Sequence, residues 1–231
     1  MIRPFVNKEI QMVLGAVRLS GSSGWFKKLQ KIEFSTLMAI TLLTCRRERA
    51  ILSNGANYAF RKGAFEESKA YTNNLKINTG DDVFLLHSVK AKYPNSIAFA
   101  KEKSAIVITD AVQTVSGFIN QRKRWTAKSS GYKDNASIYT SFLVLFTNLV
   151  FVFLFVMNFW NIEYFNLFIL FYGVKFLVDL ILLFPILKFF NRTDLVKWIF
   201  PFEIFYSFYI VLIVVLSFTK SFEWKGRVHS K

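Results

Sequence analysis

Three short clusters of polar residues contain the side chains that could do chemistry in this chain. The first cluster is QRKRW at residues 121–125, shortly before a long apolar run. An arginine there could clamp a diphosphate through its planar guanidinium group, and the flat face of Trp125 could stack against a sugar ring. The same residues also suit a membrane anchor, because Arg and Lys contact lipid phosphates and Trp favours the interface. The residues alone leave both interpretations open.

The second cluster is TGDDVFLL at residues 79–86, in which Asp81 and Asp82 are adjacent. Two neighbouring carboxylates repel each other when both are ionised, and partial burial adds to this effect. The pKa of at least one of them is therefore raised toward the range of a general base. The alternative is capping of a helix N-terminus, where carboxylates are favourable for electrostatic reasons. Both interpretations predict that the pair lies at the start of a helix.

The third cluster is NGANYAFRK at residues 54–62. The small residues Gly55 and Ala56 allow the backbone to approach a ligand closely, and Asn54 and Asn57 offer hydrogen bonds to hydroxyl groups. An ordinary loop that enters a helix or a strand has a similar composition. This cluster is therefore not specific when it is considered alone.

The elements that must position these clusters are predicted from hydrophobic periodicity. Apolar residues at helical spacing predict helices over Trp25–Leu43 and Asp81–Lys92, and short apolar runs predict strands over residues 96–99 and 105–109. Helices and strands alternate in this part of the chain. We therefore expect a mixed α/β segment up to about residue 135.

A helix at the membrane interface and three membrane spans are predicted to follow. Residues 112–125 have an apolar face and a strongly basic end, as interfacial helices do. The run from Ile138 to Trp160 has no charged residue and matches the ~20 apolar residues that cross a bilayer. Two further apolar runs, Tyr164–Leu187 and Trp198–Phe218, have a similar length.

The second and third spans contain charged residues. Lys175 and Asp179 are four residues apart, so they lie on one helical face, and we expect a mutually neutralising pair packed between helices rather than a transport site. Glu203 lies near the start of the third span, where we expect the interface to tolerate it. The basic residues of 188–197 and of the tail also conflict: three complete crossings place them on opposite sides, against the positive-inside rule. Either one span is re-entrant or the tail is an exception.

The composition narrows the kind of partner and excludes a disulfide framework. The chain has 27 Phe and a formal net charge of +15, and most of the basic residues precede about Asp134 whereas the Phe-rich runs follow it. Such a charge favours a polyanionic partner, either nucleic acid or an anionic membrane surface. Because the basic residues gather beside the apolar spans and match no motif that reads nucleic acid, the membrane is favoured. The lone Cys45 excludes an intramolecular disulfide and fits a reducing compartment.

The order of the three clusters, followed directly by apolar spans, resembles the membrane-bound family 2 glycosyltransferases, the group that includes cellulose-, chitin- and hyaluronan-synthase-like enzymes. In that family a glycine-containing loop precedes an E-D or D-D motif, and a Q-x-x-R-W motif follows on an interfacial helix. The closing sequence WKGR at 224–227 also looks like the tail of many bacterial members. The resemblance implies a partial GT-A-type (Rossmann-like) α/β domain followed by an interfacial helix and about three transmembrane helices.

The resemblance also implies boundaries and roles. The expected parts are an acceptor-side portion of the α/β domain over 1–111, the interfacial helix and a linker over 112–137, the membrane region over 138–220, and a basic tail over 221–231. Asp82 matches the catalytic base, which Asp81 would tune or position. The other roles are donor diphosphate binding by Gln121 and Arg124, and acceptor binding by Trp125, Asn54, Gly55, Ala56 and Asn57.

Cofactor and partners follow from the same resemblance. The family holds a divalent metal, Mg or Mn, with a D-x-D motif in its donor-binding half, and no D-x-D occurs in this chain. We therefore expect a C-terminal part that is inactive alone, whose partners are a nucleotide-sugar donor, a lipid or glycan acceptor, membrane lipids and a separate donor-binding half. The expected location is the bacterial inner membrane, as a multi-pass protein with the α/β part in the cytoplasm. The alternative is a non-enzymatic polytopic membrane protein whose basic domain binds lipid headgroups or a partner protein.

Overall fold

The computed structural model describes residues 1–21, 24–46, 48–68, 81–129, 131–218, 221–224 and 227–230. Its helices are α1 (Trp25–Arg46), α2 (Lys62–Ser68), α3 (Asp81–Lys92), α4 (Val115–Ser129), α5 (Asn135–Met157), α6 (Ile162–Phe189) and α7 (Val196–Ser217). Its strands are β1 (Met12–Gly15), β2 (Val17–Ser20), β3 (Tyr58–Phe60), β4 (Ile97–Ala100), β5 (Val107–Asp110), β6 (Ser221–Trp224) and β7 (Arg227–Ser230). Short 3-10 turns are η1 (Arg3–Val6), η3 (Lys103–Ala105) and η4 (Thr193–Leu195).

The strands of the α/β part are arranged around β1 and β2, which follow each other with only Ala16 between them. β1 pairs with β3 in an antiparallel manner and with β4 in a parallel manner, so that Leu14 lies opposite both Tyr58 and Phe99. β2 pairs with β5 in parallel, and the amide of Val107 donates to the Ala16 carbonyl at 3.0 Å. All four residues of β1 are buried, as expected for a strand with neighbours on both sides.

The elements predicted from periodicity are confirmed, with small shifts at their ends. α3 has the predicted bounds, and α1 continues to Arg46, beyond the predicted end at Leu43. The strands predicted over 96–99 and 105–109 correspond to β4 and β5, and the predicted interfacial helix corresponds to α4. The three apolar runs form α5, α6 and α7, each of which is long and apolar enough to cross a membrane.

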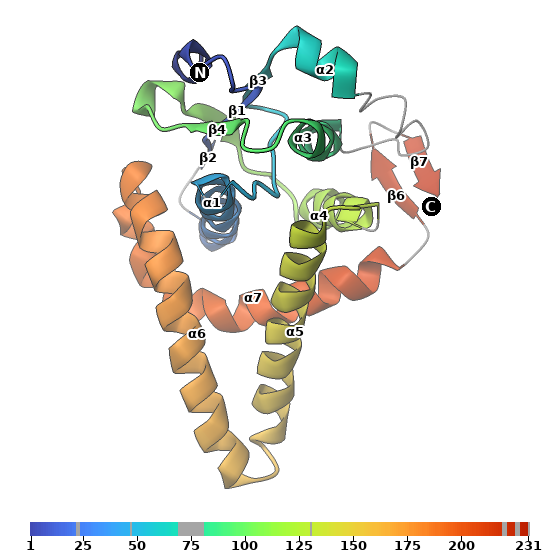
Figure 1. Ribbon diagram of the computed structural model, residues 1–231. Helices are drawn as coiled ribbons and strands as arrows, with labels where there is room; N and C mark the ends of the chain where they lie inside the picture. Colours follow the sequence, from blue (N-terminus) through green and yellow to red (C-terminus); the bar gives the residue numbers. More distant parts are fainter. Residues whose placement is uncertain are drawn as a thin grey trace.

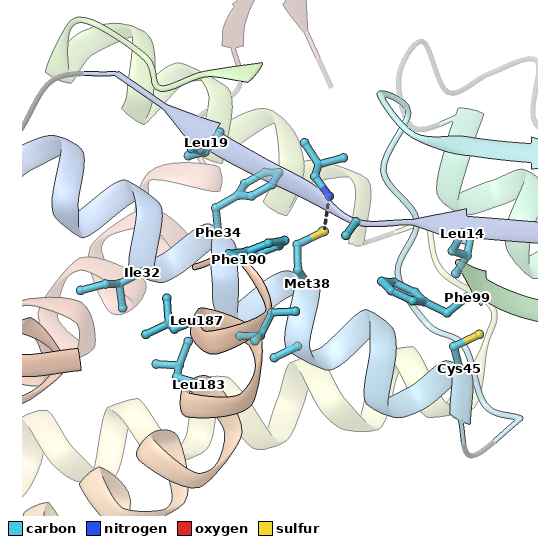
Figure 2. Close-up of a cluster of buried hydrophobic side chains, with 14 of the residues drawn as sticks. Leu14, Leu19, Ile32, Phe34, Met38, Cys45, Phe99, Leu183, Leu187 and Phe190 are labelled. Carbon is cyan, nitrogen blue, oxygen red and sulfur yellow. Dashed lines mark hydrogen bonds between the residues drawn. The ribbon is translucent and has the colours of Figure 1, made fainter. Parts of the chain in front are cut away.

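The α/β part and the apolar helices share one hydrophobic core. Figure 2 shows side chains of α1 and β2 packed against the last turns of α6, and the residues that meet there include Leu19, Phe34, Met38, Leu183, Leu187 and Phe190. The backbone amide of Val17 donates to the sulfur of Met38 at 3.5 Å within the same cluster. The C-terminal end of α6 is therefore part of the core of the α/β part. The domain boundaries predicted above remain a prediction.

Helices α5 and α6 form a hairpin that extends away from the α/β part (Figure 1). Phe151 of α5 is fully buried against Phe168 and Tyr172 of α6, with ring centroids 5.3 and 5.9 Å apart. The outward faces carry exposed apolar side chains, such as Phe146 and Ile181. An apolar outer surface of this length suits a lipid environment rather than water.

Helix α7 has a different direction from the hairpin. It crosses α5 and α6 instead of running alongside them (Figure 1), and it also contacts α1 and α4. The chain then returns to the α/β part, because β6 lies beside α4 and forms a hairpin with β7. This arrangement favours a re-entrant path for α7 over a complete crossing, because β6 lies on the same side as α4.

Three charged residues of α6 and α7 form one group between these helices. Lys175 bonds Asp179 at 2.7 Å, which confirms the predicted pair, and it also forms a short ion pair with Glu203. The sequence predicts that Glu203 is tolerated because it lies near the interface. That explanation is wrong: its side chain is only 6% exposed, and its ion pair with Lys175 accounts for its presence. α7 crosses α6 at this point and presents Glu203 to the ammonium group of Lys175. A carboxylate at this depth requires such a partner.

The path of α7 can be tested by single-cysteine labelling in sealed vesicles. The native thiol Cys45 is buried and can be replaced by Ala. We expect cysteines at Glu66 and Ser230 to react with a membrane-impermeant maleimide from one side, and a cysteine at Asn161, in the turn of the α5–α6 hairpin, to react from the other. Labelling of position 230 from the same side as position 161 would mean that α7 crosses the bilayer completely.

Candidate active site between helices α3 and α4

Asp82 lies in the first turn of α3, and its carboxylate joins the acidic cluster to the N-G-A-N loop. The backbone amide of Gly55 donates to Asp82 Oδ2 at 2.7 Å, and the amide of Val83 donates to Asp82 Oδ1 at 2.9 Å. A side chain Cβ at Gly55 would lie 3.5 Å from Asp82 Oδ2, which is ordinary contact. The loop and the helix therefore fix the orientation of this carboxylate.

Two further side chains lie within electrostatic reach of Asp82. Burial lowers the pKa of Arg124 on α4, and the charge of Asp82 opposes this shift. Burial raises the pKa of Tyr132 to about 12, and Asp82 adds to this effect. Tyr132 packs edge-on against Phe84 and His87 of α3, with ring centroids 5.9 and 5.2 Å away. Sequence reasoning missed Tyr132, because it belongs to none of the three clusters.

The asparagines of the loop shape the backbone around Gly55. The side chain of Asn54 accepts a hydrogen bond from the amide of Ala56 at 3.0 Å, which forms a local turn. Asn57 is buried, and its side-chain amide donates to the carbonyls of Ala16 and Ala105 at 2.7 and 2.8 Å. Both amide hydrogens of Asn57 are thus used within the fold. Acceptor binding by the loop remains a prediction.

The position of α4 is set by a buried ion pair between α4 and α1. Arg122 donates Nε and Nη2 to the two carboxylate oxygens of Glu33 at 2.8 and 2.6 Å. Tyr209 of α7 donates to the same carboxylate at 3.0 Å. Arg122 and Glu33 are both buried, with side chains only 5% and 7% exposed. A two-pronged geometry of this kind is the strongest form of such a pair. Sequence reasoning gave Arg122 no role.

Two residues of the Q-x-x-R-W motif, Gln121 and Trp125, contact Arg122, which is not itself part of the motif. Gln121 accepts a short hydrogen bond from Arg122, and the guanidinium carbon of Arg122 lies 4.1 Å from the centroid of Trp125. Trp125 also packs against Phe34 of α1, with ring centroids 6.3 Å apart. One side of the indole is therefore covered by the guanidinium group.

A second tie joins α1 to the chain that enters α4. The amide side chain of Gln30 bonds the backbone of Val112 twice, as donor and as acceptor, at 2.9 Å each.

Helix α3 is bonded to the first apolar helix through His87, which contacts the Ile51 carbonyl at 3.2 Å and the Ser137 hydroxyl at 3.0 Å. Ser137 lies in the first turn of α5. The apolar helices are thus bonded directly to the helix that carries Asp82.

Thr79, Gly80 and the side chain of Asp81 in the acidic cluster lie outside the described set, and so do residues 225–226 of the closing WKGR sequence. Within the described ranges, no three His, Cys, Asp or Glu side chains lie close enough together to hold a metal ion. The divalent metal stays a prediction of the resemblance.

A family model described as glycosyl transferase family group 2 matches residues 2–224. The chain belongs to this family. The match covers nearly the whole chain, and the mixed sheet, its helices and the three apolar helices fit a GT-A-like domain followed by transmembrane helices. The match is to family 2 as a group, so the cellulose-, chitin- and hyaluronan-synthase-like subgroup remains a prediction. No curated protein matches the chain.

The ion pair predicts a large stability effect in this glycosyltransferase. We expect Glu33→Gln to lower the free energy of unfolding by about 3–5 kcal/mol, because it leaves the buried Arg122 without its charge partner. The double variant Glu33→Gln/Arg122→Met should recover much of that loss. Glu66→Gln, at an exposed pair with Lys62, is the control and should change stability by less than about 1 kcal/mol. Thermal unfolding in detergent measures all three, and an equal effect at positions 33 and 66 would contradict the role of burial.

His87 predicts a pH dependence. Burial lowers its pKa, and the Asp134 carboxylate opposes the shift. Below about pH 6.5 the unfolded state therefore binds more protons at this residue than the folded state, so stability falls as the pH falls. We expect His87→Gln to flatten the decline in melting temperature between about pH 7.5 and about pH 5.5 relative to the wild type. Parallel pH profiles of the two proteins would contradict this assignment.

Proposed function

We propose that this chain takes part in inverting glycosyl transfer from a nucleotide-sugar donor to a lipid or glycan acceptor at the membrane. The observation that carries the proposal is the contact between the Gly55 amide and Asp82, with Arg124 of the Q-x-x-R-W motif within electrostatic reach. Three segments that are far apart in the sequence meet there. Family membership supports a transferase over a non-enzymatic membrane protein.

In the proposed step Asp82 acts as the general base. Its carboxylate accepts the proton of the acceptor hydroxyl, and the hydroxyl oxygen forms a bond to the anomeric carbon of the donor sugar. The bond between that carbon and the diphosphate oxygen breaks, and the nucleoside diphosphate leaves with the bonding electron pair. Asp81, the preceding residue on α3, would tune or position this carboxylate. The attack from the opposite face inverts the anomeric configuration.

The other residues of the proposed site bind the two substrates. Arg124 would stabilise the charge of the leaving diphosphate, which a half-buried guanidinium group does more effectively than one in water. Gln121 would assist it, because its carboxamide is held in place by Arg122. Trp125 and the loop from Asn54 to Asn57 would lie on the acceptor side. A donor-binding segment and a divalent metal, which the family resemblance implies, would hold the donor and belong to the proposal, and no part of the step above is assigned to the metal.

The arrangement at the membrane is also part of the proposal. The site residues Asp82 and Arg124 lie on α3 and α4, and α4 contacts α7. The α/β part would face the cytoplasm, where nucleotide sugars are made, and the chain would reside in a bacterial inner membrane. An acceptor that is itself a lipid, or a glycan growing at the membrane, would reach Asp82 from the side of the α/β part that faces the apolar helices.

Asp82→Asn tests the proposal. We expect this substitution to reduce sugar transfer by roughly 100- to 10,000-fold, because an amide cannot accept the proton while the shape of the side chain is kept. The assay measures transfer from radiolabelled nucleotide sugars into the lipid and glycan fractions of membranes that contain the chain, with the donor half supplied in trans. Glu66→Gln, an exposed acid on α2, serves as the control and should leave transfer unchanged. Equal transfer by wild type and Asp82→Asn would exclude Asp82 as the base.

A further inference from the structure

Positive side chains of the α/β part converge on the connection between α6 and α7. Arg18 of β2 donates Nη1 to the carbonyl of Phe190, just after the end of α6, at 3.5 Å. Lys28 of α1 lies over the ring of Trp198 in α7, with Nζ 3.9 Å from the ring centroid. Lys103 of η3 approaches the same connection from another side. The connection is therefore surrounded by cations that come from distant parts of the sequence.

We define the junction cluster as the cations Arg18, Lys27, Lys28, Lys31 and Arg192. Burial lowers the pKa of Lys31, and the positive charges of Arg192, Lys27 and Arg18 lower it further, while Asp194 opposes them. Asp194 is itself held by Arg192 at 2.8 and 2.9 Å. Three further cations and the carboxylate of Asp194 thus act on Lys31, so positive charges outnumber negative ones around it. Lys31 is buried and donates to the Gly21 carbonyl at 2.9 Å, and Lys27 donates to Gln113 Oε1 at 2.6 Å, which holds both ammonium groups in place.

The junction cluster lies at the level where the apolar helices meet the α/β part. Phe184 of α6 and Phe200 of α7 are exposed apolar residues close to the connection, and Lys188 in the last turn of α6 and Lys197 in the first turn of α7 are exposed cations on either side of it. Trp198 stands between these two kinds of surface. Tryptophan and basic residues at the ends of apolar helices are typical of the lipid headgroup region.

We propose that the junction cluster binds the phosphate group of an anionic membrane lipid. A phosphate offers negative charge and several acceptor oxygens, which match the guanidinium and ammonium donors of the cluster. Free inorganic phosphate shares this chemistry, but the neighbouring Trp198, Phe184 and Phe200 favour a phosphate that carries acyl chains. The proposal does not rest on glycosyl transfer, since none of these residues belongs to the site around Asp82.

The test compares lipid binding by variants of the full chain in a neutral detergent. Native mass spectrometry measures the affinity for phosphatidylglycerol, for phosphatidylcholine and for inorganic phosphate. We expect the wild type to prefer phosphatidylglycerol, and Lys27→Gln/Lys28→Gln to weaken that binding roughly 30-fold, since each basic residue near an anionic surface contributes about 1 kcal/mol. Lys27→Arg/Lys28→Arg keeps the charge and should keep the binding.

The matched control is Lys8→Gln/Lys62→Gln, which removes the same charge from exposed positions of η1–β1 and α2. An equal loss in this control would overturn the proposal, because total charge and not the cluster would then determine binding. Equal binding of the two lipids by the wild type and by the Arg variant would also overturn it, even if the Gln variant does not fold. If inorganic phosphate binds as tightly as the lipid and is lost in the same variant, the cluster is a free-anion site and the lipid assignment is wrong.

Discussion

The buried pair of Arg122 and Glu33 is the interaction on which the arrangement of the molecule depends. Removing two charges from water is costly, and the cost is offset only when the geometry is good and the remaining hydrogen-bonding groups have partners. Here both carboxylate oxygens are bonded, Tyr209 donates to one of them, and the guanidinium group lies against Trp125. Since a shift of any one partner would leave a charge buried alone, α1, α4 and α7 are held in one relative position.

This constraint connects the apolar helices to the candidate site. α7 turns its polar side chains inward, toward Glu33 and toward Lys175, and exposes apolar residues such as Phe205 and Leu212. α6 contributes its last turns to the core of the α/β part. The distance between Arg124 and Asp82 therefore depends on how the apolar helices pack, and the site is not a separate soluble module that an anchor merely retains at the membrane.

Local features of this fold could be predicted from the sequence, and long-range pairings could not. Periodicity and length identify the helices and the apolar spans, and the spacing of four residues identifies the pair of Lys175 and Asp179. The partners of Arg122 and Glu203 lie 89 and 28 residues away, so no local pattern contains them. The direction of α7 depends on those pairings, which is why its composition alone suggests a complete crossing. Of the candidate site, the motifs identify Asp82 and Arg124, whereas Tyr132 comes close to them only through the packing of α3.

The basic residues behind the net charge of +15 lie in several different environments. Arg122 and Lys175 are buried and neutralised by carboxylates, so they contribute to packing and not to the surface potential. Arg124 is half-buried and within electrostatic reach of Asp82. The excess that remains lies on the surface, and part of it is concentrated around the connection between α6 and α7. Because buried pairs cancel locally, the number of basic residues alone does not show where the unneutralised charge of the molecule lies.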